Sequence, residues 1–287
     1  EIAPSDWSSD VCSSDLEKKE DPGFPSKLYY GFFMSWGCFT AIPCPNKIWH
    51  EAARNMMLET LKFVGLVVGI IEIGLYCLAD WLGIPNIFTG AVLTVYPFLI
   101  TGCIHLDGFM DCCDAISSRR PIEEKRKILK DSRVGAFAVT NSIFLILIYF
   151  ASVLSILEGA NSELKICILA IGYFITRMMS AHVLMNWKTI EGSQYESSSK
   201  ETGNFAASLR NIGIGIAVIV LFEFAVWRYF CEILPSAFIS PLFCWLLYIL
   251  SVAGARRQLK GISGDIAGYS LVIGETAMAV SLAVIGC

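Results

Sequence analysis

Residues 135–157 read GAFAVTNSIFLILIYFASVLSIL, 23 consecutive residues without one charged side chain. The hydrocarbon core of a bilayer is about 30 Å thick, and a helix needs about 20 mostly apolar residues to cross it. A helix also satisfies its backbone hydrogen bonds internally, which lipid demands of any spanning segment. This stretch therefore predicts a transmembrane helix, and it sets the interpretation of the rest of the chain.

Six other stretches have a similar length and apolar character: 61–79, 86–106, 164–186, 211–231, 236–253 and 266–286. We therefore expect an all-α protein, a polytopic helical bundle with about seven transmembrane spans and a range of six to eight. The segment from Tyr29 to Ile42 is apolar but short, and prolines follow it. It favours an interfacial or re-entrant segment over a span.

The composition of the 287-residue chain agrees with a lipid-embedded protein. Hydrophobic residues make up 55% and charged residues only 17%, whereas a soluble domain carries roughly 25% charge. So many apolar residues also exclude a disordered chain. The net charge of −4 argues against a nucleic-acid partner.

The eleven cysteines do not resemble a disulfide framework, because several lie in apolar runs where cysteine behaves as a small hydrophobe. No C-x-x-C pair occurs, so a structural zinc site is not expected. We expect ordinary reduced thiols, including the adjacent pair Cys112 and Cys113.

The distribution of lysine and arginine orients the spans. With a cytoplasmic N-terminus the inner segments are 1–62, 107–134, 187–210 and 254–265, and they hold nineteen of the 22 basic residues. This bias follows the positive-inside rule. It predicts a cytoplasmic N-terminus and an outer C-terminus.

The chain divides into three predicted parts. Residues 1–16 repeat Ser-Ser-Asp, have no amphipathic period, and are interpreted as a foreign or disordered leader. Residues 17–60 form a cytoplasmic or interfacial N-terminal segment, and residues 61–287 form the transmembrane catalytic domain.

The first candidate motif is 105–114, HLDGFMDCCD, at the inner end of the predicted second span. Asp107, Asp111 and Asp114 are spaced i, i+4, i+7, which places three carboxylates on one helix face. Such like charges repel unless a cation lies among them. Oxygen ligands suit Mg²⁺ or Mn²⁺, and Mg²⁺ often shares its ligands with phosphate. The alternative is three solvated acids at a helix end.

The second motif is 130–135, KDSRVG, just before the third span. A helix N-terminus and an arginine both bind phosphate. The alternative is a helix cap by Ser132 with membrane anchoring by the basic residues.

The third motif is 260–268, KGISGDIAG, entering the last span, with Glu275 about three turns further along. Its glycines allow either close approach of a ligand or close helix packing. Packing does not explain Asp265 and Glu275, which are costly near lipid.

Arg177 and Ser180 share one face of the fourth span. An arginine within the membrane requires a partner. That partner is a phosphate or a carboxylate in a functional interpretation, and the alternative is a structural ion pair between helices.

Together the three motifs resemble those of the cobalamin synthase family, the adenosylcobinamide-GDP ribazoletransferases. Residues 39–45, FTAIPCP, also resemble the family's N-terminal F-x-x-x-P-x-P. The resemblance runs from about Phe39 to Glu275. The chain departs from the family at Ala115 and Ala138, where glycine is common, and at Ile266-Ala267, where Thr-Leu is usual.

The resemblance implies a multi-pass enzyme of a prokaryotic plasma membrane with a cytoplasmic active site. It would join adenosylcobinamide-GDP to α-ribazole, or to its 5′-phosphate, and release GMP with the help of Mg²⁺, or alternatively Mn²⁺. The ribazole 3′-hydroxyl would attack the phosphorus attached to cobinamide.

The resemblance also assigns roles to residues. Asp107, Asp111 and Asp114 would hold the metal, with Asp111 also essential for catalysis. Asp131 or Asp265 would serve as the base or as further metal ligands. The substrate-binding residues would be Lys130, Ser132, Arg133, Arg177, Ser180 and Gly264.

Two other classes compete with this interpretation. The CDP-alcohol phosphatidyltransferases also place aspartates at a membrane surface, but the rest of their motif is missing after Asp114. A secondary transporter would favour inverted repeats and charges near the midplane, and no repeat relates the two halves here.

Overall fold

The computed structural model describes residues 23–195, 204–230 and 235–285, so the predicted leader, 1–16, lies outside the described residues. Within these ranges the fold is all-helical, as predicted, and its only strand-like pairing is an isolated bridge between Thr189 and Ile262. The helices are α2 (Phe24–Phe39), the 3-10 turn η1 (Glu51–Ala53), α3 (Arg54–Trp81), α4 (Asn86–Ile100), α5 (Ile104–Ser117), α6 (Ile122–Ile128), α7 (Ala136–Glu158), α8 (Ser162–Asn186), α10 (Asn204–Phe230), α11 (Pro235–Leu259) and α12 (Gly264–Ile285).

Among the described residues, five helices are long and apolar enough to cross a membrane: α3, α7, α8, α11 and α12. The bent pair α4 and α5 raises the number to six if it is counted as one broken span. α10 coincides with the predicted span 211–231, and its apolar part is Leu209–Phe222. The described helices thus coincide in order with the seven predicted segments, and five to six of them are long and apolar enough to span a membrane.

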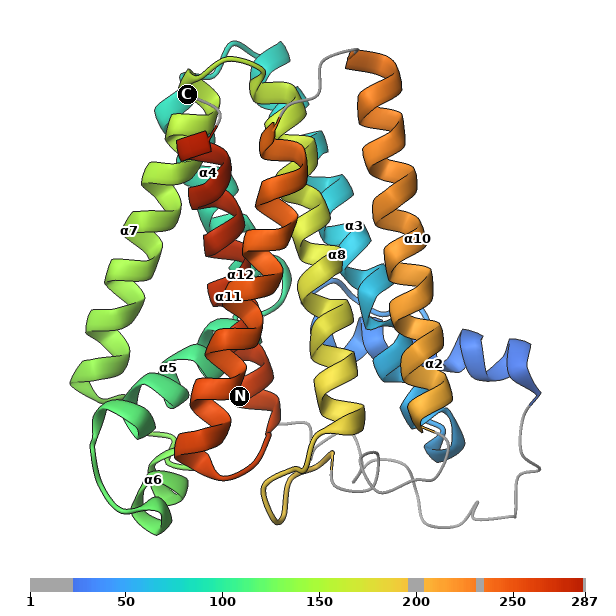
Figure 1. Ribbon diagram of the computed structural model, residues 1–287, viewed down its shortest axis with the longest axis vertical. Helices are drawn as coiled ribbons and strands as arrows, with labels where there is room; N and C mark the ends of the chain where they lie inside the picture. Colours follow the sequence, from blue (N-terminus) through green and yellow to red (C-terminus); the bar gives the residue numbers. More distant parts are fainter. Residues whose placement is uncertain (1–22, 196–203, 231–234, 286–287) are drawn as a thin grey trace.

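α8 is the central helix of the bundle, and nearly all of its side chains are buried. α3 packs closely on one side of α8 at Gly65. A Cβ at this position would lie only 2.3 Å from the carbonyl oxygen of Tyr173, so the absence of a side chain permits the close approach. α10, α11 and α12 also pack against α8 (Figure 1). The outer helices α4, α7, α10 and α11 expose large apolar side chains, and these form the surface that lipid would cover.

The predicted second span, 86–106, is not one continuous helix. α4 ends at Ile100, and α5 begins at Ile104 with its axis turned by 87°. Gly102 and Cys103 both have φ of 60°, the left-handed conformation that stops a right-handed helix. The chain therefore turns sharply just before the first acidic motif, and the motif lies on a helix of its own.

The N-terminal segment supports this bend. α2 has 16 residues, is not among the candidate spans, and lies across the bundle in Figure 1. After α2 the Ala41 amide donates a hydrogen bond to the Ile100 carbonyl at 2.8 Å. Phe39 stacks on His105 in the first turn of α5, with ring centroids 6.3 Å apart. The FTAIPCP segment thus holds the junction between α4 and α5, while α3 runs through the expected domain boundary at residue 60/61.

One end of the bundle gathers the connections that carry the motifs. The start of α7, helix α6, the end of α8 and the turn between α11 and α12 lie together at the bottom of Figure 1. The eight cysteines in the described ranges are all free thiols.

Candidate active site

α5 carries the acidic face that its sequence spacing predicts. Asp107 is exposed, while Asp111 and Asp114 are partly exposed. The negative charges of Asp107, Asp265 and Asp114 all act on the Asp111 carboxyl. We call these four residues the acid cluster. It joins the first and third sequence motifs at one place on the surface.

Asp114 binds the N-terminus of α7. Its Oδ2 accepts a hydrogen bond from the Gly135 amide at 2.6 Å, and its Oδ1 accepts one from the Ala138 amide at 2.9 Å. A carboxylate at this position satisfies amides that have no partner within the helix and complements the helix dipole. Phosphate binding and a helix cap by Ser132 were the two interpretations of this helix terminus, and the structure shows it occupied by a carboxylate of the chain itself.

α5 and α12 approach each other closely beside the acid cluster. A Cβ on Gly108 would lie 2.9 Å from both the Cα and the carbonyl oxygen of Asp265. A Cβ on Gly268 would lie 3.3 Å from the Cα of His105. Ser263 donates a hydrogen bond from Oγ to Oδ2 of Asp265 at 3.1 Å. The motif glycines thus bring two helix backbones together and fix the position of Asp265 relative to Asp111.

Asp131 and Arg133 form an ion pair on the loop before α7. Nη2 of Arg133 lies 2.7 Å from Oδ2 of Asp131, and Nε lies 3.0 Å from Oδ1. The hydrogen bonds from Arg133 lower the pKa of Asp131 to about 2. A carboxyl group so stabilised as its anion is a weak base, so this pairing disfavours Asp131 as the proton acceptor.

The remaining polar residues of the second motif face outward. Lys130 and Ser132 are exposed, as is Arg133 despite its ion pair. They are therefore placed where a soluble substrate could reach them.

The segment after α8 connects the second and third motifs. The Ile262 amide donates to the Lys188 carbonyl at 3.0 Å, and the Ile190 amide donates to the Ile262 carbonyl at 2.8 Å. Further along this segment a Cβ on Gly192 would lie 3.9 Å from Nζ of Lys130. At Gly264 a Cβ would lie 3.1 Å from the Tyr195 ring. Gly264 is thus covered by an aromatic ring in this arrangement.

Arg177 and Ser180 lie in the bundle interior, away from the exposed loops. Arg177 is 1% exposed, and its Nη1 lies 2.7 Å from Oε1 of Glu275. Ser180 donates to the Thr176 carbonyl. Glu275 is ten residues beyond Asp265, which is about 15 Å along a helix. The structure therefore gives the structural alternative, an ion pair between α8 and α12.

The acid cluster does not form a complete metal site on its own. In the described part of the chain, no group of three or more His, Cys, Asp or Glu side chains converges on one point that could hold a metal ion. Mg²⁺, however, usually takes one or two carboxylates and completes its shell with water and substrate phosphates. Asp107 and Asp111 fit that requirement, because both are accessible and neither has an ion-pair partner among the described side chains.

Sequence reasoning missed a second group of residues at this end of the bundle. The sequence interpretation treated Lys188, Arg256 and Arg257 only as basic residues of the inner segments. The structure places these three residues around one pocket. The signal available in the sequence was Trp187-Lys188 after one predicted span and Arg256, Arg257 and Lys260 after another.

The sequence profile of the cobalamin-5-phosphate synthase family matches residues 31–283. Residues 31–283 hold the three motifs, the acid cluster and all the helices from α3 to the last turns of α12. No solved structure matches the chain.

Curated relatives are similar over nearly the same length. An adenosylcobinamide-GDP ribazoletransferase of Clostridium botulinum (strain Alaska E43 / Type E3) is 38% identical over 86% of this chain and 94% of the relative. One of Clostridium perfringens (strain SM101 / Type A) is 33% identical over 87% and 96%, respectively. A third, of Halalkalibacterium halodurans, is 31% identical over 85% and 92%.

Proposed function

The chain belongs to the cobalamin-5-phosphate synthase family, and from this premise we propose how its structure carries out the reaction. It is an adenosylcobinamide-GDP ribazoletransferase of cobalamin biosynthesis, which joins adenosylcobinamide-GDP to α-ribazole. We place the reaction at the acid cluster. The observation that carries this placement is the contact between Gly108 and Asp265, which brings two separate motifs of the family to one accessible surface.

The reaction is a displacement at a phosphorus atom of a negatively charged diphosphate, with GMP as the leaving group. Such reactions depend mainly on positioning and on neutralisation of charge. A divalent cation, when bound, supplies Lewis-acid stabilisation of the diphosphate oxygens. Asp107 and Asp111 would hold it on α5, while Asp114 keeps α5 fixed to the start of α7.

The chain's own residues have separable roles in this proposal. Lys130 and Arg133 are exposed beside the acid cluster and would bind phosphate oxygens. Asp131 orients the guanidinium of Arg133. Asp265 would accept the proton of the attacking hydroxyl, since it has no cationic partner among the described side chains and Ser263 holds one of its oxygens.

The active site is proposed to face the cytoplasm of a prokaryotic cell. The support is the number of lysines and arginines at the end of the bundle that carries the motifs, from Lys125 on α6 to Lys260 after α11. Such a bias marks the inner side of a membrane protein.

Two measurements test the proposal. Protein purified in detergent with Mg²⁺ should release GMP from adenosylcobinamide-GDP only when α-ribazole is present. Release of CMP from a CDP-alcohol instead would overturn the reaction. For the orientation, substrates added to inside-out membrane vesicles should react, whereas the same substrates outside right-side-out vesicles should not. The reverse result would overturn the cytoplasmic placement.

A further inference from the structure

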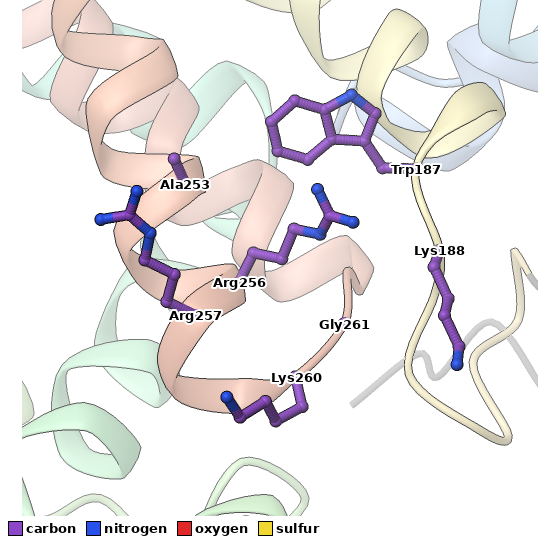
Figure 2. A pocket seen from close by; sticks show the side chains of 7 residues that line it. All are labelled: Trp187, Lys188, Ala253, Arg256, Arg257, Lys260 and Gly261. Atoms are coloured by element: carbon purple, nitrogen blue, oxygen red, sulfur yellow. The ribbon is translucent and has the colours of Figure 1, made fainter.

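A pocket lies between the end of α8 and the end of α11, outside the acid cluster. Its volume is about 500 Å³. Figure 2 shows that Trp187 and Lys188 line it from the segment after α8, while the other lining residues come from the end of α11 and the turn that follows. These are Ala253, Arg256, Arg257, Lys260 and Gly261. We call this the basic pocket.

The lining of the basic pocket holds four cationic side chains and no acidic one. Lys188, Arg257 and Lys260 form no ion pair with any described side chain, in a chain whose net charge is −4. The guanidinium of Arg256 lies 4.8 Å from the centre of the Trp187 ring and points toward it in Figure 2. A concave surface of one charge attracts a ligand of the opposite charge, so this pocket is suited to an anion.

The pocket's shape and lining favour a nucleotide over a small inorganic anion. The Trp187 indole and the Arg256 guanidinium packed on it offer flat surfaces on which a purine base stacks. The other cationic groups of the lining bind the phosphates of the nucleotide. A single phosphate would leave most of a 500 Å³ cavity unfilled.

The turn that follows the basic pocket leads directly into the proposed active site. Gly261 at its edge begins the turn that leads through Ser263 to Asp265. The backbone hydrogen bond from Ile262 to Lys188 ties the two walls together. A ligand with its base against Trp187 could therefore extend a diphosphate toward the acid cluster.

We propose that the basic pocket binds the guanosine diphosphate end of adenosylcobinamide-GDP and retains GMP after the transfer. The inference rests on the proposed function. The phosphates lie against Lys188, Lys260 and Arg257, and the guanine lies against Trp187. The N-terminus of α7 is already occupied by Asp114 and does not bind phosphate in this proposal. Phosphate binding therefore falls to the cations of the second motif and to those of the basic pocket.

The test compares Lys188→Ala/Lys260→Ala with Lys127→Ala, an exposed lysine on α6 outside the pocket. Equilibrium dialysis with labelled GMP should give a Kd about tenfold higher for the double variant and an unchanged Kd for the control. The KM for adenosylcobinamide-GDP should rise by a similar factor, while the KM for α-ribazole stays constant. Trp187→Ala should weaken GMP binding more than Trp187→Phe, which keeps an aromatic ring.

Other outcomes would overturn the inference. An anionic lipid headgroup offers the same phosphate chemistry, so the variants are also compared for binding to phosphatidylglycerol vesicles. Loss of vesicle binding with an unchanged Kd for GMP would identify a lipid site instead. An unchanged Kd for GMP with unchanged vesicle binding would leave the pocket with no anionic ligand.

Failure of the proposed function gives a different result. In that case the parent protein releases no GMP from adenosylcobinamide-GDP, yet it still binds GMP and loses that binding when Lys188 and Lys260 are replaced.

Discussion

The Asp114 carboxylate on α5 accepts a hydrogen bond from the backbone amide of Gly135, at the start of α7, across 2.6 Å. The two residues belong to different sequence motifs, so this bond fixes the first motif to the second. A Cβ on Gly135 would lie 2.6 Å from Oδ1 of Asp114, so a side chain there would have to displace the carboxylate. Asp114 thus positions a helix as well as adding negative charge to the acid cluster.

The helix-capping role predicts that Asp114→Ala lowers the free energy of unfolding by about 1–2 kcal/mol, because two amides of α7 lose their acceptor. Thermal unfolding in detergent measures the change. Asp107→Ala is the matched control, since it removes an exposed acid from the same helix face and should shift stability by less than about 0.5 kcal/mol. Equal effects of the two substitutions would contradict the capping role.

The close approach of α5 and α12 predicts that Gly108→Ala loses most activity. The added methyl group must displace the Asp265 backbone, and a shift of about 1 Å between reacting groups costs about 100-fold in rate. Gly74→Ala in α3 is the control, because nothing lies within 4 Å of its Cβ position. A Gly108→Ala variant with parental kcat would show that the spacing of these helices does not matter.

The buried ion pair predicts that Arg177→Met destabilises the protein by about 3–5 kcal/mol, because Glu275 is left as an unpaired buried charge. Arg177→Met/Glu275→Gln should recover much of that loss. Thermal unfolding reports the stability, and the KM for adenosylcobinamide-GDP reports substrate binding. A double variant that is stable but has a strongly raised KM would return Arg177 to the substrate-binding residues.

The proposed metal site predicts that EDTA abolishes GMP release and that Mg²⁺ restores it. Asp111→Asn removes one charge from the acid cluster and should raise the Mg²⁺ concentration needed for half-maximal rate by about tenfold or more. The measurement is a Mg²⁺ titration of the initial rate. Turnover that persists in EDTA would remove the metal from the mechanism.

The ion pair with Arg133 predicts that protonation of Asp131 does not contribute to the pH dependence of the reaction. Its pKa of about 2 keeps the carboxyl ionised at neutral pH and well below it. Asp131→Asn should therefore lower kcat/KM through loss of Arg133 orientation, without shifting the pH profile of kcat between about pH 5 and 9. A pH profile that loses its acidic limb in this variant would assign the base to Asp131.

Hydropathy and charge predicted the helical bundle and the end of it that carries the motifs, because lipid imposes length and composition on each span. The break after α4 escaped prediction. Gly102 and Cys103 occur within an apolar run, and their left-handed conformation leaves no mark on hydropathy. The contacts of FTAIPCP with α4 and α5 that support the break are visible only in three dimensions.

The sequence predicted which residues form the candidate site, but it did not predict most of the contacts between them. The i, i+4, i+7 spacing placed Asp107, Asp111 and Asp114 on one face, as α5 shows. The spacing could not reveal that Asp114 binds the start of α7. Nor could it choose the partner of Arg177, because several carboxylates were available and only tertiary packing selects Glu275.

The bend after α4 also affects how deep in the membrane the active site lies. α4 has 15 residues and is about 22 Å long, shorter than the roughly 30 Å hydrocarbon layer. In the proposed orientation, α4 enters from the outer surface and ends before the inner surface, and α5 begins below it. The carboxylates would then lie close to the hydrocarbon layer, where the local dielectric constant is lower than in open water and each neutralised charge contributes more to the rate.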